Sequence, residues 1–189
     1  MIDTLPLSIF RYCPRCGSTD HETPSVKLFA CRSCGFRYFQ NAAAAVIGVI
    51  QDPAGRVLFT RREREPSRGK LDLPGGFVDP QETAEVAVAR EIREETGLDV
   101  VGTKFLASFT NRYEYRGVTY YTLDLVFQCA VADLRPLAAR DEVTDVLFLH
   151  PSEIDENELS FESVRAVMRT LAAAVRERVR TSEDNSETA

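Results

Sequence analysis

The sequence lacks tryptophan, has only two histidines and contains no long apolar run. The longest nearly apolar stretch, residues 42–50, is about half the length that a membrane-spanning helix needs. The first residues show no basic start followed by an apolar segment, so we expect neither a secretory signal nor a membrane span, and place the protein in the cytoplasm. A net charge of −6, from 23 basic and 29 acidic residues, excludes a general polyanion-coating protein. We therefore do not expect a membrane or nucleic acid as partner.

Cysteine and charge divide the chain near residue 40. Four of the five cysteines precede that point, and residues 1–40 carry five basic against three acidic side chains, whereas the remainder carries 18 against 26. We expect one small domain over residues 1–40 and a larger one over residues 41–180. Residues 181–189 are polar and acidic without a large apolar side chain, which predicts a disordered tail.

The larger part mixes strand and helix patterns. Asp79 as N-cap, Pro80 at the first helical position and Gly97 as a stop predict a helix over residues 80–96. Apolar residues at helical spacing predict a second helix over residues 161–180. Valine- and isoleucine-containing apolar segments predict strands over residues 43–51, 57–61, 100–110, 120–131 and 146–149. This order indicates a mixed α/β sandwich.

Two copies of C-x-x-C-G lie in the small domain with fourteen residues between them. Zinc binds four soft ligands in a tetrahedron, and each C-x-x-C turn brings two thiolates to a suitable separation. Two disulfides or a redox dithiol are the alternatives, but nothing indicates an oxidising compartment and two matched pairs do not suit a redox motif. The expected ligands of a closed, structural zinc site are Cys13, Cys16, Cys31 and Cys34. Cys129 lies in a strand pattern and fits a small buried hydrophobe.

The first predicted helix carries three carboxylates on its apolar side. At about 100° per residue, Glu91, Glu94 and Glu95 fall within an arc of roughly 100° that the apolar residues of the earlier turns also occupy. Like charges so close together are unfavourable, and more so when partly buried. Arg90 and Arg93 point elsewhere on the helical wheel and reach only the flank. A hard divalent cation, Mg²⁺ or Mn²⁺, explains the arrangement, with a surface charge cluster as the alternative.

The glycine-rich segment before this helix completes a longer motif. Residues 76–98 match G-x5-E-x7-R-E-U-x-E-E-x-G-U, with U aliphatic, at every fixed position, and the motif resembles the Nudix box. The flanking strands and the last helix also resemble a Nudix domain, an α/β/α sandwich with a mixed sheet. The cysteine pairs resemble the zinc ribbon that precedes some Nudix domains, including NADH pyrophosphatases and certain ADP-ribose or FAD pyrophosphatases.

The resemblance implies roles for the residues of the box. Glu91, Glu94 and Glu95 would bind the catalytic metal, with the Gly76 carbonyl as a further ligand. Arg90 would hold a carboxylate in place through a charge-assisted hydrogen bond. Glu82 would have a supporting role near the loop.

Hydrolysis also needs a base that activates the attacking water. Either Glu91 or Glu95 could act, or a carboxylate from a later loop. Our candidate for that loop is Glu142, which follows Asp141 ahead of the strand near residue 146; a surface charge is the alternative.

Family members cleave a pyrophosphate in a nucleoside diphosphate linked to another group, and ADP-ribose or a similar nucleotide sugar or dinucleotide is the substrate class that we expect. The S-Q-P-W segment of NADH pyrophosphatases has no counterpart here. NADH or FAD cleavage, removal of an NAD-type cap from RNA, and a non-enzymatic nucleotide-sensing regulator are the alternatives. Aromatic segments 111–115 and 120–121 could stack on a nucleotide or pair across a sheet, so substrate-binding residues stay open. The resemblance also implies a homodimer.

Overall fold

The computed structural model describes residues 5–173, and these divide into two compact units. We call residues up to Ala43 together with Arg112–Thr122 the ribbon unit, and Ala44–Asn111 together with the residues from Leu123 onward the sheet unit. Within the described range no helix is long and apolar enough to cross a membrane. The expected tail over residues 181–189 and the last turns of the expected second helix lie outside the described residues.

The ribbon unit contains a three-stranded antiparallel sheet of β1 (His21–Ser25), β2 (Leu28–Cys31) and β3 (Arg37–Phe39), preceded by a short 3-10 helix, η1 (Pro6–Ile9). Its small core consists of four buried residues, Leu7, Cys13, Phe29 and Cys31. Phe10 packs edge-on against Phe29 with ring centroids 5.7 Å apart. These strands were not predicted from the sequence, because all three residues of β3 are exposed and the apolar pattern is too sparse.

The sheet unit is built around two sheets, with strand orders β10-β5-β6 and β7-β4-β9-β8; the adjoining ends of β8 and β9, within residues 112–122, belong to the ribbon unit. The pairs β10–β5, β5–β6 and β4–β7 are antiparallel. All five predicted strands are present, while β6 and β7 were missed because they are two and three residues long beside proline and glycine. The strand bounds are β4 (Ala43–Val49), β5 (Val57–Arg62), β6 (Leu71–Asp72), β7 (Gly75–Phe77), β8 (Val100–Tyr115), β9 (Val118–Val131) and β10 (Val143–Leu149).

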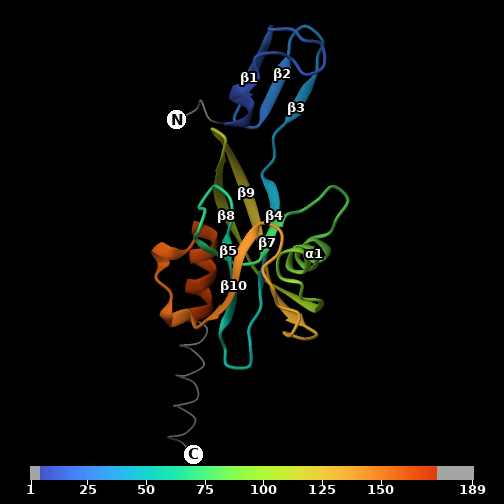
Figure 1. Cartoon of the computed structure of the whole chain (residues 1–189). Helices are drawn as coiled ribbons and strands as arrows, with labels where there is room; N and C mark the ends of the chain where they lie inside the picture. Colours follow the sequence, from blue (N-terminus) through green and yellow to red (C-terminus); the bar gives the residue numbers. More distant parts are fainter. Residues whose placement is uncertain (1–4, 174–189) are drawn as a thin grey trace, which may run out of the picture. The chain divides into compact units, whose positions relative to one another are not determined.

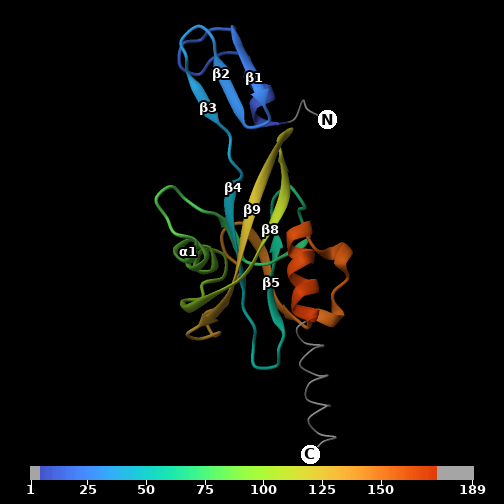
Figure 2. The same ribbon diagram turned by 180° about the vertical axis from the view of Figure 1, so that it is seen from behind.

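Neighbouring residues of the central strands point into two different cores. Val46 and Leu58 pack in one cluster with Ala87, Val88 and Ile92 of the helix α1. The next residues along the same strands, Ile47 and Phe59, pack in another cluster with Val164, Val167 and Met168. Side chains alternate across a strand, so both faces of these strands are covered, which explains the unbroken apolar run at residues 42–50. Figures 1 and 2 show α1 and the helix at residues 162–173 on opposite sides of the strands.

The helix α1 (Ala84–Thr96) begins four residues later than the sequence predicted. Thr83, not Asp79, is the N-cap, and its hydroxyl accepts a hydrogen bond from the backbone N–H of Val86. Gln81 has a positive φ of 71°, which interrupts any helix running through residues 80–83. Gly97 ends the helix in the left-handed conformation at φ 75°, as expected.

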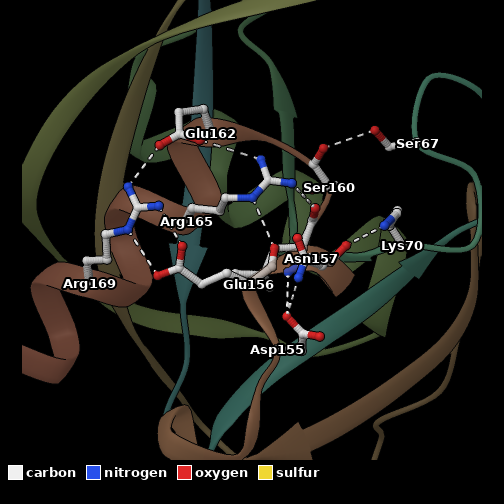
Figure 3. A network of polar contacts seen from close by, with 10 residues as sticks. Ser67, Lys70, Asp155, Glu156, Asn157, Ser160, Glu162, Arg165 and Arg169 are labelled. Carbon is white, nitrogen blue, oxygen red and sulfur yellow. Dashed lines mark hydrogen bonds and ion pairs between the residues drawn. The ribbon is translucent and has the colours of Figure 1, made fainter.

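A polar network holds the segment before the last helix (Figure 3). The guanidinium of Arg165 donates to the backbone carbonyls of Glu156 and Leu159, at 3.0 and 2.7 Å. Across from it, the hydroxyl of Ser67 donates to the carbonyl of Ser160 at 3.0 Å. This segment, which includes η2 (Pro151–Glu153) and η3 (Glu156–Glu158), is thereby tied both to the helix at residues 162–173 and to the β5–β6 loop.

Candidate functional site

The segment at residues 74–76, which we call the glycine turn, leads into strand β7 and lies directly on strand β4, with Gly75 and Gly76 paired to Ile47 and Val46. The N–H of Gly48 donates to the carbonyl of Pro74 at 2.8 Å. A Cβ atom on Gly75 would lie 2.1 Å from the carbonyl oxygen of Val46, so only glycine permits this approach of two backbones. The turn is therefore fixed in place by the sheet.

The next glycine faces the first acidic residue of the motif. A Cβ on Gly76 would lie 2.4 Å from Oε1 of Glu91 and 2.8 Å from Oε2. The Glu91 carboxylate thus occupies the space that a side chain at position 76 would fill. Glycine at this position keeps backbone and carboxylate next to each other.

Arg90 lies at the centre of the acidic cluster and not at its flank. Its Nε and Nη2 donate to the two carboxylate oxygens of Glu82, both at 2.9 Å. Its Nη1 donates to Glu91 at 2.8 Å and to Glu94 at 3.0 Å, and Nη2 also reaches the carbonyl of Phe77 at 3.0 Å. The expectation from the helical wheel was wrong for Arg90, because the wheel places Cα positions and ignores the length of an arginine side chain.

The arginine compensates the acids unequally. Hydrogen bonds from Arg90 lower the pKa of Glu82. Glu91 behaves differently: burial raises its pKa, the charges of Glu94 and Glu82 add to the rise, and Arg90 only opposes it. One cation therefore serves three carboxylates, and Glu91 is left with a deficit of positive charge.

Glu95 is the least compensated carboxylate of the cluster. Its Oε2 accepts a hydrogen bond of 3.2 Å from the N–H of Gly75, which links α1 to the glycine turn. Burial raises its pKa well above the usual value, and the charges of Asp72 and Glu91 raise it further. Glu95 therefore lies beside the glycine turn in surroundings that disfavour its ionised form.

A second charge pair, between Arg62 of β5 and Asp72 of β6, adjoins this acid. Nη1 of Arg62 binds Oδ2 of Asp72 at 2.9 Å, and the guanidinium lies 4.9 Å from the ring centroid of Phe161. Burial raises the pKa of Asp72 despite this pairing. This pair was not predicted from the sequence. The available signal was one acid in the apolar segment 71–74, but its partner lies ten residues away and on another strand.

The donor set of this cluster fits a hard divalent cation. Carboxylate and carbonyl oxygens are the ligands that Mg²⁺ and Mn²⁺ take, and a cation would relieve the raised pKa values of Glu91 and Glu95. Within residues 5–173, however, these carboxylates do not form a group with all donor atoms inside 4.8 Å. Glu91 and Glu94 each turn an oxygen to Arg90, while Glu95 turns one to Gly75.

The loop acid Glu142 is not in hydrogen-bond contact with these carboxylates in the described structure. It is exposed, and its carboxylate pairs with Arg64 at 2.5 Å. The same loop is nevertheless tied to α1, because the N–H groups of Ala138 and Arg140 donate to the carbonyls of Thr96 and Glu95 at 3.0 and 2.9 Å. These bonds satisfy carbonyls that a helix C-terminus otherwise leaves without a partner. Glu142 is thus two residues from a bond to the backbone of Glu95.

The cysteine quartet forms a second candidate site, in the ribbon unit. Cys13, Cys16, Cys31 and Cys34 are the group in residues 5–173 whose potential metal-binding atoms all lie within 4.8 Å of one another. The Sγ atoms of Cys13 and Cys34 are 3.8 Å apart, and those of Cys16 and Cys31 are 3.7 Å apart. Four sulfurs around a zinc ion at about 2.3 Å would be separated by about 3.8 Å, whereas a disulfide requires about 2.05 Å.

Cys13 and Cys16 of this quartet have pKa values shifted in opposite directions. Burial raises the pKa of Cys13, but backbone N–H groups at Cys16 and Arg15 outweigh it and lower the pKa to about 7. For Cys16 the N–H of Ser18 acts in the lowering direction, yet the neighbouring thiols and burial raise the pKa to about 12. A cation bound between the thiolates of Cys13 and Cys16 would offset the repulsion that raises the pKa of Cys16. Cys129 is separate and buried, and burial raises its pKa to about 12, in line with a small hydrophobe.

Comparison with known proteins places this architecture among related chains. The family model described as "NUDIX domain" matches residues 41–177. An NAD-capped RNA hydrolase NudC of Stutzerimonas stutzeri is 30% identical over 102 residues, which are 54% of this chain and 36% of that protein. An ADP-ribose pyrophosphatase of Methanocaldococcus jannaschii is 46% identical over 63 residues, 33% of this chain and 37% of that protein. The chain thus matches little more than a third of the length of these two relatives.

Solved structures share the fold at lower identity. A NUDIX hydrolase from Nitrosomonas europaea superimposes with a TM-score of 0.66 and 23% identity, over 86% of this chain and 91% of that one. The NUDIX domain of Shewanella oneidensis NrtR, solved with ADP ribose, gives a TM-score of 0.59 and 22% identity, and the superposition covers 75% of this chain and 90% of that one. The expected α/β fold class is confirmed by these neighbours.

Proposed function

Since this chain belongs to the Nudix family, we propose that it is a divalent-metal-dependent hydrolase that cleaves the pyrophosphate bond of a nucleoside diphosphate linked to another group. The observation that carries the proposal is the pairing of Gly76 with Glu91 and of Gly75 with Glu95. Two partly desolvated acids are thereby held against one turn, and a bound cation would compensate them.

In this proposal the metal ligands are the carboxylates of Glu91, Glu94 and Glu95 and the carbonyl of Gly76. A bound Mg²⁺ or Mn²⁺ would neutralise the diphosphate and lower the pKa of a bound water. Arg90 would act as the positioning residue, since its contacts with Glu82 and Phe77 fix the guanidinium that orients Glu91 and Glu94.

We propose Glu142 as the base that takes the proton from the attacking water. Its support is the attachment of residues 138–140 to the last turn of α1, which keeps this loop near Glu95. The Arg64–Glu142 pair is exposed on both sides, so breaking it costs little and leaves the carboxylate free to turn. Glu91 or Glu95 itself is the alternative base.

ADP-ribose is the substrate that we test first. A relative that is 46% identical over its aligned part is named an ADP-ribose pyrophosphatase, and a solved neighbour holds ADP ribose. The second candidate is removal of an NAD-type cap or cleavage of NADH or FAD, supported by the relative named NAD-capped RNA hydrolase. The absence of tryptophan argues against the NADH pyrophosphatase segment.

The ribbon completes the proposal. We propose that Cys13, Cys16, Cys31 and Cys34 hold a structural Zn²⁺, because their spacing suits a tetrahedron and four ligands close the site. Zinc thiolates suit a reducing compartment, in keeping with a cytoplasmic protein. The division into a zinc ribbon over residues 1–40 and a hydrolase domain over 41–180, and a homodimer, are part of the same proposal.

The test is nucleotide release from ADP-ribose, NADH, FAD and NAD-capped RNA with Mg²⁺ or Mn²⁺, with Glu95→Gln as the control. We expect either AMP from ADP-ribose, NADH or FAD, or nicotinamide mononucleotide from the NAD-capped RNA. The control is expected to lose at least about two orders of magnitude in rate, the scale at which one catalytic group acts. Turnover that persists in Glu95→Gln would contradict the assigned site. Tight nucleotide binding without turnover in the wild type would favour the sensing regulator instead.

A further inference from the structure

All six tyrosines of the chain lie in the ribbon unit. Four of them are direct neighbours of an arginine in the sequence, in the pairs Arg11-Tyr12, Arg37-Tyr38, Arg112-Tyr113 and Tyr115-Arg116. The sheet unit, which is more than twice as large, contains no tyrosine. Such a concentration of one side chain does not follow from the needs of a hydrophobic core.

These aromatic rings face solvent in large part. The exposed fractions are 62% for Tyr12, 56% for Phe39, 54% for Tyr121 and 42% for Tyr115. Along β3, Tyr38 and Phe39 follow the exposed Arg37 on an edge strand. Exposed aromatics are surfaces on which flat molecules can stack, and stacking on tyrosine needs little reorganisation because the ring has only two torsions.

At the β8–β9 turn the rings are already arranged for stacking. The rings of Tyr113 and Tyr115 are nearly parallel, with centroids 6.3 Å apart and an angle of 29° between their planes. The guanidinium of Arg116 lies 5.3 Å from the centroid of Tyr115. A cation above an aromatic ring is the arrangement that proteins use beside a stacked base.

The cations of the ribbon unit outnumber the acids that could neutralise them. The unit carries seven Arg or Lys against four Asp or Glu, while the rest of the chain carries 16 against 25. Of the acids in the described part of the unit, Asp20 and Glu22 both pair with Arg32, and Glu114 pairs with Arg112. Apart from Arg116, which lies over Tyr115, the described part of the ribbon unit has four exposed cations without an ion pair: Arg11, Arg15, Lys27 and Arg37.

We propose that the ribbon unit is a binding surface for single-stranded nucleic acid. Bases would stack on Tyr115, Tyr121 and Phe39, and phosphates would contact Arg11 and Arg37. We expect base stacking to contribute more of the binding free energy than charge does. A zinc ion with four thiolate ligands carries two negative charges, so the ribbon unit keeps only a local excess of cations. Whole-chain charge argued against this partner, since it averages the ribbon unit with a strongly acidic sheet unit.

Charge complementarity favours nucleic acid over a second copy of the chain as the occupant. Pairing two ribbon units through these residues would bring unpaired arginines against unpaired arginines. A phosphodiester chain offers instead one negative charge per nucleotide beside each base, which matches the alternation of arginine and aromatic side chains.

The experiment measures fluorescence anisotropy of a 3′-labelled single-stranded RNA about 12 nucleotides long, with a 5′-hydroxyl end. This RNA contains no pyrophosphate, and the buffer contains no Mg²⁺ or Mn²⁺, so the proposed hydrolysis does not enter. The zinc-loaded full chain is titrated at about 50 and 200 mM salt. DNA of the same sequence and a duplex serve as comparison ligands.

Matched variants separate stacking from nonspecific charge. We expect Tyr115→Ala with Tyr121→Ala to weaken binding by about tenfold or more, whereas Phe105→Ala, equally exposed in the sheet unit, leaves it unchanged. Tyr121→Phe keeps the ring and is expected to bind like the wild type. Arg11→Gln with Arg37→Gln is expected to weaken binding and to reduce the slope of log affinity against log salt concentration by about 0.7 for each phosphate that is no longer neutralised, unlike Arg135→Gln.

Several outcomes would overturn the proposal. These are no saturable binding at the lower salt concentration, binding that is indifferent to the tyrosine variants, and preference for the duplex. A tyrosine variant that shifts the oligomeric state in ultracentrifugation without an effect on RNA binding would assign the surface to a second copy. Zinc content and hydrolysis of ADP-ribose, measured on the same variants, control for folding and keep this test separate from the proposed activity.

Discussion

Replacing Glu95 by glutamine is expected to stabilise the protein without divalent metal and to destabilise it relative to wild type when metal is present. Burial, Asp72 and Glu91 all raise the pKa of Glu95, so its ionised form opposes folding at neutral pH. Glutamine has nearly the same shape, carries no charge and can still accept the 3.2 Å hydrogen bond from the N–H of Gly75. The substitution therefore removes the charge and keeps the contact.

The magnitudes follow from the size of the protein and from linkage. Removing the one buried negative charge is expected to raise the free energy of unfolding by about 1–2 kcal/mol. For a protein of this length, about 1 kcal/mol shifts Tm by about 2–4 °C. Mg²⁺ at about 100 times its Kd is expected to raise the free energy of unfolding of the wild type by about 2.7 kcal/mol. In the variant the same concentration of Mg²⁺ raises it far less. The order of the two Tm values therefore reverses on addition of metal.

The pH dependence has a defined sign. When folding raises the pKa of a carboxyl group, the folded protein holds that proton to a higher pH than the unfolded chain does. The free energy of unfolding therefore falls as the pH rises from the pKa of the unfolded state to the pKa of the folded state. The advantage of Glu95→Gln without metal is thus full above the raised pKa of Glu95 and disappears as the pH falls toward about 4.3, the unfolded value.

Scanning calorimetry is the assay, because it resolves separate transitions if the two units unfold independently. Buffers are cleared of Mg²⁺ and Mn²⁺ on a resin, without chelator in solution, so that the ribbon keeps its zinc. A variant less stable than wild type in metal-free buffer, or equal gains from Mg²⁺ in both proteins, would refute the assignment of Glu95 as a desolvated metal ligand.

Three further substitutions test the remaining parts of the proposal. Gly76→Ala places a Cβ 2.4 Å from Oε1 of Glu91, so we expect kcat to fall by about 100-fold or more in the AMP-release assay with zinc content unchanged. Glu142→Gln is expected to lower kcat by about 10²–10⁴-fold with intact Mn²⁺ binding by titration calorimetry, while Arg64→Gln stays near wild type; similar rates for both variants would exclude Glu142 as the base. Cys16→Ser removes one of four ligands, so zinc measured by atomic absorption should fall well below one ion per chain; full retention would contradict the quartet.

The parts of the site that lie close together in the sequence could be predicted, and the long-range parts could not. Spacing within one helix places Glu91, Glu94 and Glu95 on one side, and two C-x-x-C turns suffice to indicate the quartet that the structure gathers. The helical wheel misjudged the reach of Arg90, whose partner Glu82 lies in the segment before the helix. Its hydrogen bonds to Glu91 and Glu94 agree instead with the carboxylate-holding contact that the resemblance implied.

Two further features depend on tertiary contacts that no local pattern encodes. The Arg62–Asp72 pair joins β5 and β6 across their sheet. The helix start at Thr83 results from the left-handed Gln81, a conformation that propensity does not anticipate at glutamine. The strands β4 and β5 were readable because consecutive apolar residues are buried on both of their faces, whereas β1 and β3 of the ribbon unit, largely exposed, gave no such signal.

The attachment of the loop at residues 138–140 to α1 has a consequence for amide hydrogen exchange. The N–H groups of Ala138 and Arg140 belong to a loop, yet their acceptors are the carbonyls of Thr96 and Glu95 in the helix. Exchange at these two amides requires the opening of bonds to the last turn of α1, so their protection follows the helix and not the neighbouring loop amides. Two probes outside the acidic cluster thus report how often the backbone that carries Glu95 opens.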